Sequence, residues 1–247
     1  MRNSNPIFKS DTFTRSGYQV GQETMTVSGT INKAMSLLFL LVASSLSTFL
    51  YLAMTGKFET VAIFAGVGIV ATLILGMVAC FKPQTCHVTA PLYAVFEGFA
   101  LGSITMILSM KYGGIAFQAV MLTFGVAAAM FGCYRFGLIR ATEKFKSFVA
   151  AATMGVFLVI MANLLLGMFG INLPFRSGGI IGIVFSLVVI GVAALNLILD
   201  FDRIEDGARQ GLPAQMEWFA AFGLMVTMVW LYWEILRLLM ILRGSDD

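Results

Sequence analysis

Seven long apolar runs constrain the fold of this chain more than any other feature. Each run is roughly 20 residues long, which is about the length that crosses the hydrocarbon layer of a bilayer as a helix. Unpaired backbone groups are too costly in hydrocarbon for an open sheet, so strands are not expected there. We place the runs at about 34–54, 60–81, 88–110, 118–134, 148–170, 177–199 and 218–242.

The composition leads to the same class of protein. Of 247 residues, 59% are hydrophobic and only 12% are charged, and the mean hydropathy is +0.89. A soluble domain of this length could not bury so much apolar side chain. The net charge of +3 is small and the basic residues are scattered, which argues against a nucleic-acid partner. We therefore predict an all-α, polytopic protein whose partner is the lipid bilayer; the sequence does not identify a protein partner.

The distribution of polar and basic residues predicts the domains and the orientation. Residues 1–33 form a polar, cytoplasmic N-terminal tail, residues 34–243 the seven-helix transmembrane domain, and residues 244–247 a short external tail. With seven crossings, most of the 16 lysines and arginines fall in segments on the same side of the membrane as the N-terminus. Basic residues accumulate on the cytoplasmic side of membrane proteins, so we expect the N-terminus inside and the C-terminus outside.

The first candidate site is an acidic stretch at the end of the sixth run. Asp200 follows three apolar residues with no polar spacer, near the predicted inner end of the helix. A carboxylate there is costly unless it is paired, hydrated or protonated. Asp202 and Glu217 lie about equally far from the tip of the next hairpin, so they are candidates to face each other. We expect Glu205 and Asp206 to be solvated acids at the inner end of the helix.

Two further carboxylates, Glu97 and Glu234, lie deep in the third and seventh runs. Their predicted depths differ by roughly one to two turns, so one interpretation is a common cavity with a shared proton or a bound cation. Such a cation would be a hard one, Ca²⁺ in preference to a soft metal. The alternatives are a local ion pair of Glu234 with Arg237, three residues on, and a hydrogen-bonded Glu97 that holds helices together.

Several kinds of activity lack the residues that they need. The sole histidine, His87, lies in a predicted loop and belongs to no nucleophile constellation. Its spacing from Cys80 and Cys86 matches no usual zinc pattern. The chain has no P-loop and no dinucleotide fingerprint. We expect neither an enzyme nor a resident cofactor.

Three segments, residues 93–103, 199–207 and 223–239, resemble the Bax inhibitor-1 (YccA-like, transmembrane Bax-inhibitor-motif) family. Residues 25–33 resemble a bacterial subgroup of it, and the likeness covers nearly the whole chain from about residue 25. The resemblance implies six helices wrapped around a central one, in a bacterial inner membrane. It also implies a pH-sensitive Ca²⁺ leak.

The resemblance further implies a hydrogen-bonded pair of aspartates whose shared proton sets whether the pore is closed. Asp200 matches the aspartate late in helix six, but Thr227 stands where the second aspartate of the family would lie. Either Asp200 works with another acid (Asp202, Glu217 or Glu234), or the subgroup has lost this gating.

Our leading hypothesis is a proton-sensitive leak for Ca²⁺ or another cation, with Asp200 as a transient Ca²⁺ ligand. One alternative is a membrane regulatory or interaction protein that transports nothing. A second is an intramembrane aspartyl protease, which would need two aspartates at one depth. The seventh run contains no aspartate, which argues against the protease.

Overall fold

The structure is a computed structural model that describes residues 23–56, 59–169 and 179–244, and within these ranges it is helical apart from one isolated β-bridge. Seven of the described helices are long and apolar enough to cross a membrane, which confirms the predicted fold class. In chain order they are α2 (Val27–Thr55), α3 (Glu59–Phe81), α4 (Cys86–Lys111), α5 (Ile115–Arg135), α6 (Glu143–Met168), α7 (Ile180–Arg209) and α8 (Met216–Gly244); the 3-10 helix η2 (Pro83–Thr85) precedes α4.

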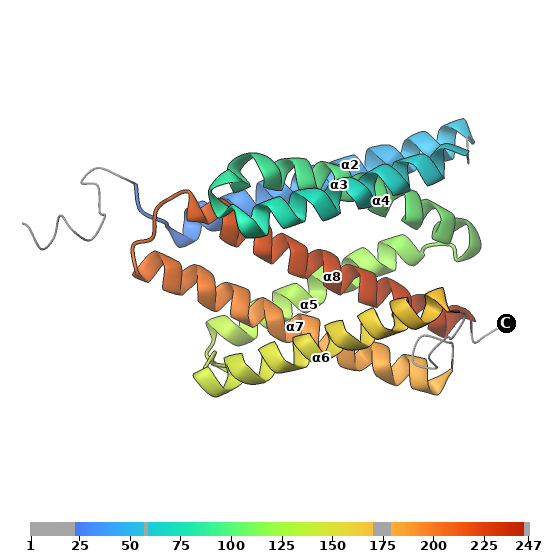
Figure 1. Cartoon of the computed structure of the whole chain (residues 1–247). Coiled ribbons are helices and arrows are strands. Elements are labelled where there is room, and N and C mark those ends of the chain that lie inside the picture. Colours follow the sequence, from blue (N-terminus) through green and yellow to red (C-terminus); the bar gives the residue numbers. More distant parts are fainter. Residues whose placement is uncertain (1–22, 57–58, 170–178, 245–247) are drawn as a thin grey trace, which may run out of the picture.

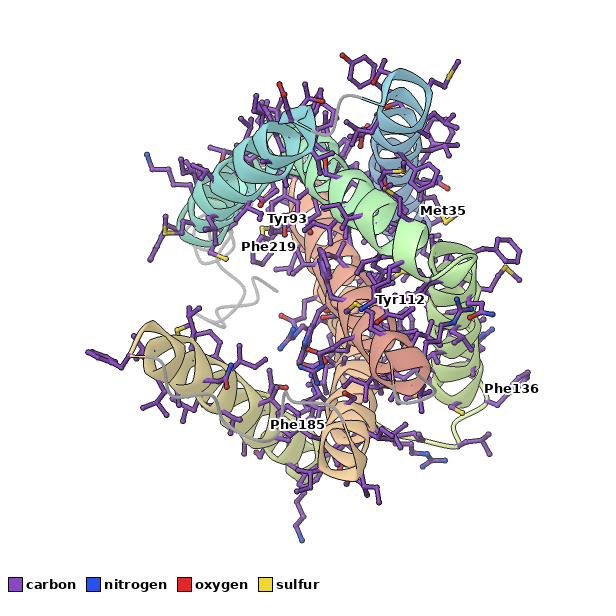
Figure 2. The ribbon with its side chains drawn as sticks, turned by 90° about the vertical axis from the view of Figure 1, so that its right-hand side faces the viewer. Met35, Tyr93, Tyr112, Phe136, Phe185 and Phe219 are labelled. Carbon is purple, nitrogen blue, oxygen red and sulfur yellow. The ribbon has the colours of Figure 1, made fainter. Side chains whose placement is uncertain are left out.

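The last helix, α8, lies in the interior of the bundle (Figures 1 and 2). Helices α2, α4, α5 and α7 pack directly against it. Helix α3 packs mainly against α4, and α6 packs mainly against α7. The resemblance implied six helices around one; four of the six are direct neighbours of α8, and two occupy outer positions.

Two helices extend furthest beyond their apolar runs. Helix α2 begins at Val27, seven residues before the run, because the Thr26 side chain caps it by accepting a hydrogen bond from the backbone N–H of Gly29. Helix α7 continues to Arg209, ten residues beyond the predicted end of its apolar run at residue 199. Ion pairs between residues three or four apart keep this polar end of α7 helical.

The start of the described chain lies against the turn between α7 and α8. Thr24 and Pro213 form an antiparallel bridge, and the backbone N–H of Met25 donates to the Leu212 carbonyl at 2.6 Å. The Met25 side chain packs on Gly207, where an added Cβ would lie only 2.9 Å from its sulfur. This contact holds the beginning of α2 to the end of the bundle at which α7 ends and α8 begins, which we call the α7–α8 end.

Glycines allow α2 and α4 to approach closely. A Cβ added to Gly98 would lie 2.7 Å from the Leu41 carbonyl oxygen, and one added to Gly102 would overlap the Ser45 carbonyl. Without a strong hydrophobic driving force between helices in lipid, such close packing is a main source of helix association.

We predict that Gly102→Ala destabilises the protein by about 1–3 kcal/mol, because the new methyl group must push α2 away from α4. Thermal unfolding in detergent measures the change. The matched control is Gly125→Ala in α5, where an added Cβ meets nothing within 4 Å. Equal melting temperatures for the two variants would contradict the prediction.

Candidate functional site

A cavity of about 710 Å³ opens at the α7–α8 end, between α6, α7 and α8. Its wall carries both charged and apolar side chains. The charged residues that line it are Lys146, Asp200, Asp202, Arg203 and Asp206. Apolar residues of α8, among them Phe219 and Ala220, and Met25 complete the wall. The cavity therefore places several charged side chains within an otherwise apolar bundle.

Asp200 lies in the wall of this cavity and joins α7 to α8. Its side chain is buried, with 6% of the residue exposed. The hydroxyl of Thr227 lies 2.6 Å from Asp200 Oδ2, and it also lies 3.2 Å from the Gly223 carbonyl oxygen. On the other side, Arg203 Nη1 lies 3.3 Å from Asp200 Oδ1. Thr227, which the family resemblance places at the position of the second aspartate, is thus the hydrogen-bond partner of Asp200 in the structure.

The Thr227 hydroxyl has one proton and two acceptors within reach. When Asp200 is ionised, Thr227 can donate to the carboxylate. When Asp200 is protonated, the carboxyl can donate to Thr227 while Thr227 donates to the Gly223 carbonyl. The bond between α7 and α8 can therefore persist in both protonation states, with its direction reversed.

The other acids of the α7–α8 end have basic partners of their own. Asp202 pairs with Lys146 of α6 at 2.8 Å. Glu217 pairs with Lys33 of α2 at 2.6 Å and also accepts from the backbone N–H of Thr26 at 2.7 Å. Asp202 and Glu217 therefore do not face each other across the hairpin. Asp202 pairs with a lysine of α6, and Glu217 pairs with a lysine of α2.

Glu97 and Glu234 are also held by separate neighbours. The indole N–H of Trp233 in α8 lies 3.5 Å from Glu97 Oε1, which links α4 to α8. Glu234 pairs with Arg237 at 2.8 Å, and Arg237 donates to the Ser186 hydroxyl of α7. The local ion pair that the sequence offered as the alternative for Glu234 is present. The described contacts do not bring the two glutamates together.

The sequence reasoning missed one of the two basic residues of the cavity, Lys146. Lys146 contacts Asp202 at 2.8 Å and Asp206 at 3.6 Å, and so it ties the start of α6 to the end of α7. A usable signal was present, because consecutive antiparallel helices bring the start of one to the end of the next. Asp206, which the sequence suggested was only a helix-end acid, also lines the cavity.

No group of three or more metal-ligating side chains occurs among the described residues. The cavity nevertheless carries three carboxylates from one end of α7, at Asp200, Asp202 and Asp206. Oxygen ligands suit hard cations such as Ca²⁺. The oxygens of these three carboxylates do not converge into such a group within the described residues.

Comparison with known protein families gives one match. The model of a family described as Bax inhibitor 1 like matches residues 5–244, nearly the whole chain. No curated protein matches the chain.

We predict that Glu217→Ala costs about 2 kcal/mol of stability, because it leaves Lys33 and the Thr26 N–H without their acceptor. Thermal unfolding in detergent measures the loss. Hydrogen exchange of the first turn of α2 should accelerate more than that of the rest of the bundle. Glu143→Ala is the control, because this exposed acid pairs only at 3.4 Å with Lys146. Exchange unchanged at residues 26–30 would contradict the assignment.

Proposed function

The chain belongs to the Bax inhibitor 1-like family, and we propose that it is a non-enzymatic membrane protein through which Ca²⁺ or a similar cation leaks under the control of Asp200. One observation carries the proposal: the charged cavity of the α7–α8 end reaches a buried aspartate that joins two helices. A buried acid at the end of a polar recess is expensive to keep in a membrane protein and is by default a functional site.

The basic residues support an orientation for this path. On the rule that lysine and arginine accumulate on the cytoplasmic side, the α7–α8 end faces the cytoplasm of a bacterial inner membrane. Lys82, Arg135, Arg140 and Lys144 all lie in or beside helix ends at this side of the bundle. The cavity is then an inner vestibule, with Asp200 as its deepest carboxylate.

Passage beyond Asp200 requires α7 and α8 to separate. The residues that continue from Asp200 toward the far end of α7, among them Leu197, Ala193 and Val192, are buried in the core. They leave no cavity along α7 beyond Asp200 among the pockets of the described residues. Asp200 and Thr227 lie at this boundary, so their hydrogen bond keeps the two helices together where the vestibule stops.

Protonation acts mainly through charge in this proposal. Since the Asp200–Thr227 bond can persist in both states, the proton of Asp200 changes what the vestibule attracts more than whether the helices touch. Ionised Asp200, with Asp202 and Asp206, makes the vestibule attractive to a cation, although Arg203 and Lys146 offset part of this charge. Leak should therefore fall as the pH falls and Asp200 gains its proton.

We predict that Asp200→Asn lowers Ca²⁺ flux into liposomes roughly tenfold at neutral pH, equivalent to about 1.4 kcal/mol, and removes most of its pH dependence. Asparagine can still bond to Thr227, but it carries no charge. Glu59→Gln, at the exposed start of α3 and outside the vestibule, is the control for a lost carboxylate. Equal flux through Asp200→Asn and the unchanged protein would remove Asp200 from the mechanism. No flux through the unchanged protein at any pH would favour a regulatory protein that transports nothing.

Thr227→Val should act in the opposite direction. Valine has nearly the same shape as threonine but cannot hold Asp200, and a hydrogen bond to a charged group contributes about 1.5–3 kcal/mol. With this link gone, α7 and α8 separate more easily and flux rises severalfold at neutral pH. Thr227→Ser keeps the hydroxyl and should resemble the unchanged protein. The gating role fails if valine and serine give the same flux.

A further inference from the structure

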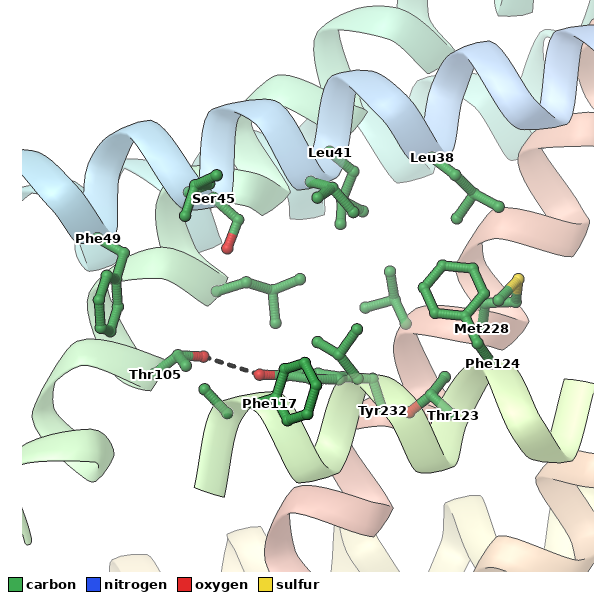
Figure 3. Close-up of a pocket in the computed structure, with 16 residues that line it drawn as sticks. Leu38, Leu41, Ser45, Phe49, Thr105, Phe117, Thr123, Phe124, Met228 and Tyr232 are labelled. Atoms are coloured by element: carbon green, nitrogen blue, oxygen red, sulfur yellow. Dashed lines mark hydrogen bonds between the residues drawn. The ribbon is translucent and has the colours of Figure 1, made fainter. Parts of the chain in front are cut away.

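We propose that a second cavity, between α2, α4, α5 and α8, binds one acyl chain of a bilayer lipid. The cavity has a volume of about 280 Å³ and contains none of the residues of the vestibule (Figure 3). Its wall is almost wholly apolar, with aromatic rings from α5 and long aliphatic side chains from α2. Representative lining residues are Leu41, Leu101, Phe117, Phe124, Met228 and Tyr232.

The hydroxyl groups of the wall give water little to bind. Thr105 and Tyr232 are hydrogen-bonded to each other at 3.0 Å (Figure 3), and Thr123 donates to the Ala119 carbonyl of its own helix at 2.7 Å. Ser45 is the remaining hydroxyl that points into the cavity (Figure 3). Apart from Ser45, only the capacity that the Thr105–Tyr232 pair leaves unused could bind water, and an ordered water needs about two to four polar partners. The cavity is suited to hydrocarbon.

The cavity is continuous with the surface that faces lipid. Its rim on α2 and α5 consists of exposed apolar residues, among them Leu46, which is 54% exposed, and Phe117, which is 70% exposed. Both helices are long and apolar enough to span the membrane, so these side chains lie among lipid chains. An unfilled cavity forfeits the dispersion contacts of its lining atoms. The nearest group that restores these contacts is an acyl chain entering between α2 and α5.

An acyl chain in this cavity would contact α8, the helix whose Thr227 bonds Asp200. Met228 and Val229 line the cavity, and Thr227, the preceding residue of α8, bonds Asp200. Successive residues of a helix point to different faces, so α8 lies between the lipid cavity and Asp200. Lipid binding itself does not depend on any transport through the vestibule.

The experiment uses the full-length protein in vesicles that contain a phosphatidylcholine with a photoreactive diazirine in its acyl chain. After irradiation, mass spectrometry locates the labelled residues. Leu101 and Met228 are buried in the bundle, 4% and 7% exposed, so bulk lipid reaches them only through the cavity. We expect label on both, in addition to label on outer faces such as Leu73 of α3.

Val120→Trp places a large ring in the cavity, and Ala116→Phe fills it from the same helix. Either change should lower the label on Leu101 and Met228 at least about fivefold and leave Leu73 unchanged, since an overfilled site excludes the chain. The matched control is Val70→Trp, on the exposed face of α3 and outside the cavity. Absence of label on Leu101 and Met228 in the unchanged protein, or undiminished label in both filled variants, would overturn the proposal. A third outcome would also overturn it: label on Leu101 and Met228 that appears only after the protein is diluted to monomers. In that case a second copy of the chain would occupy the cavity at higher protein concentration.

Discussion

A carboxylate buried in a helix bundle within hydrocarbon must find a donor or a cation, and this requirement organises the structure around α8. The described residues include four buried carboxylates, at Glu97, Asp200, Glu217 and Glu234. Each either belongs to α8 or is bonded by a side chain of α8. Hydrogen bonds and ion pairs made by α8 therefore offset the free-energy cost of burying these carboxylates.

These bonds also fix α8 against its neighbours at different depths. Glu217 holds α2 near the start of the helix, Thr227 holds α7, Trp233 holds α4, and Arg237 holds α7 again near the other end. Apolar burial discriminates little between arrangements of helices in lipid, because lipid tails are as apolar as the side chains. Directional bonds spaced along one helix, together with glycine contacts between α2 and α4, supply the specificity that hydrophobicity does not.

Much of this fold could be predicted from the sequence, because membrane thickness leaves few options for a 20-residue apolar run. The ends of α2 and α7 could not be placed from hydropathy, since a threonine cap and ion pairs extend both helices beyond their apolar runs. Only the family resemblance pointed to Thr227 as the residue opposite Asp200. The role of Lys146 became visible only in the structure, where α6 packs against α7. Depth along a helix is readable from sequence, but which face turns toward which neighbour is not.

Threonine in place of a second acid separates two roles that one shared proton would combine. In a pair of aspartates, losing the proton both adds charge and turns a hydrogen bond into repulsion. In the Asp200–Thr227 pair, the hydroxyl can serve as donor or acceptor, and the Gly223 carbonyl accepts its proton when Asp200 carries one of its own. Contact between α7 and α8 is thus maintained while the charge of the vestibule changes. Within the proposed function, the response to pH then lies in what the vestibule attracts, and the helices need not separate when Asp200 ionises.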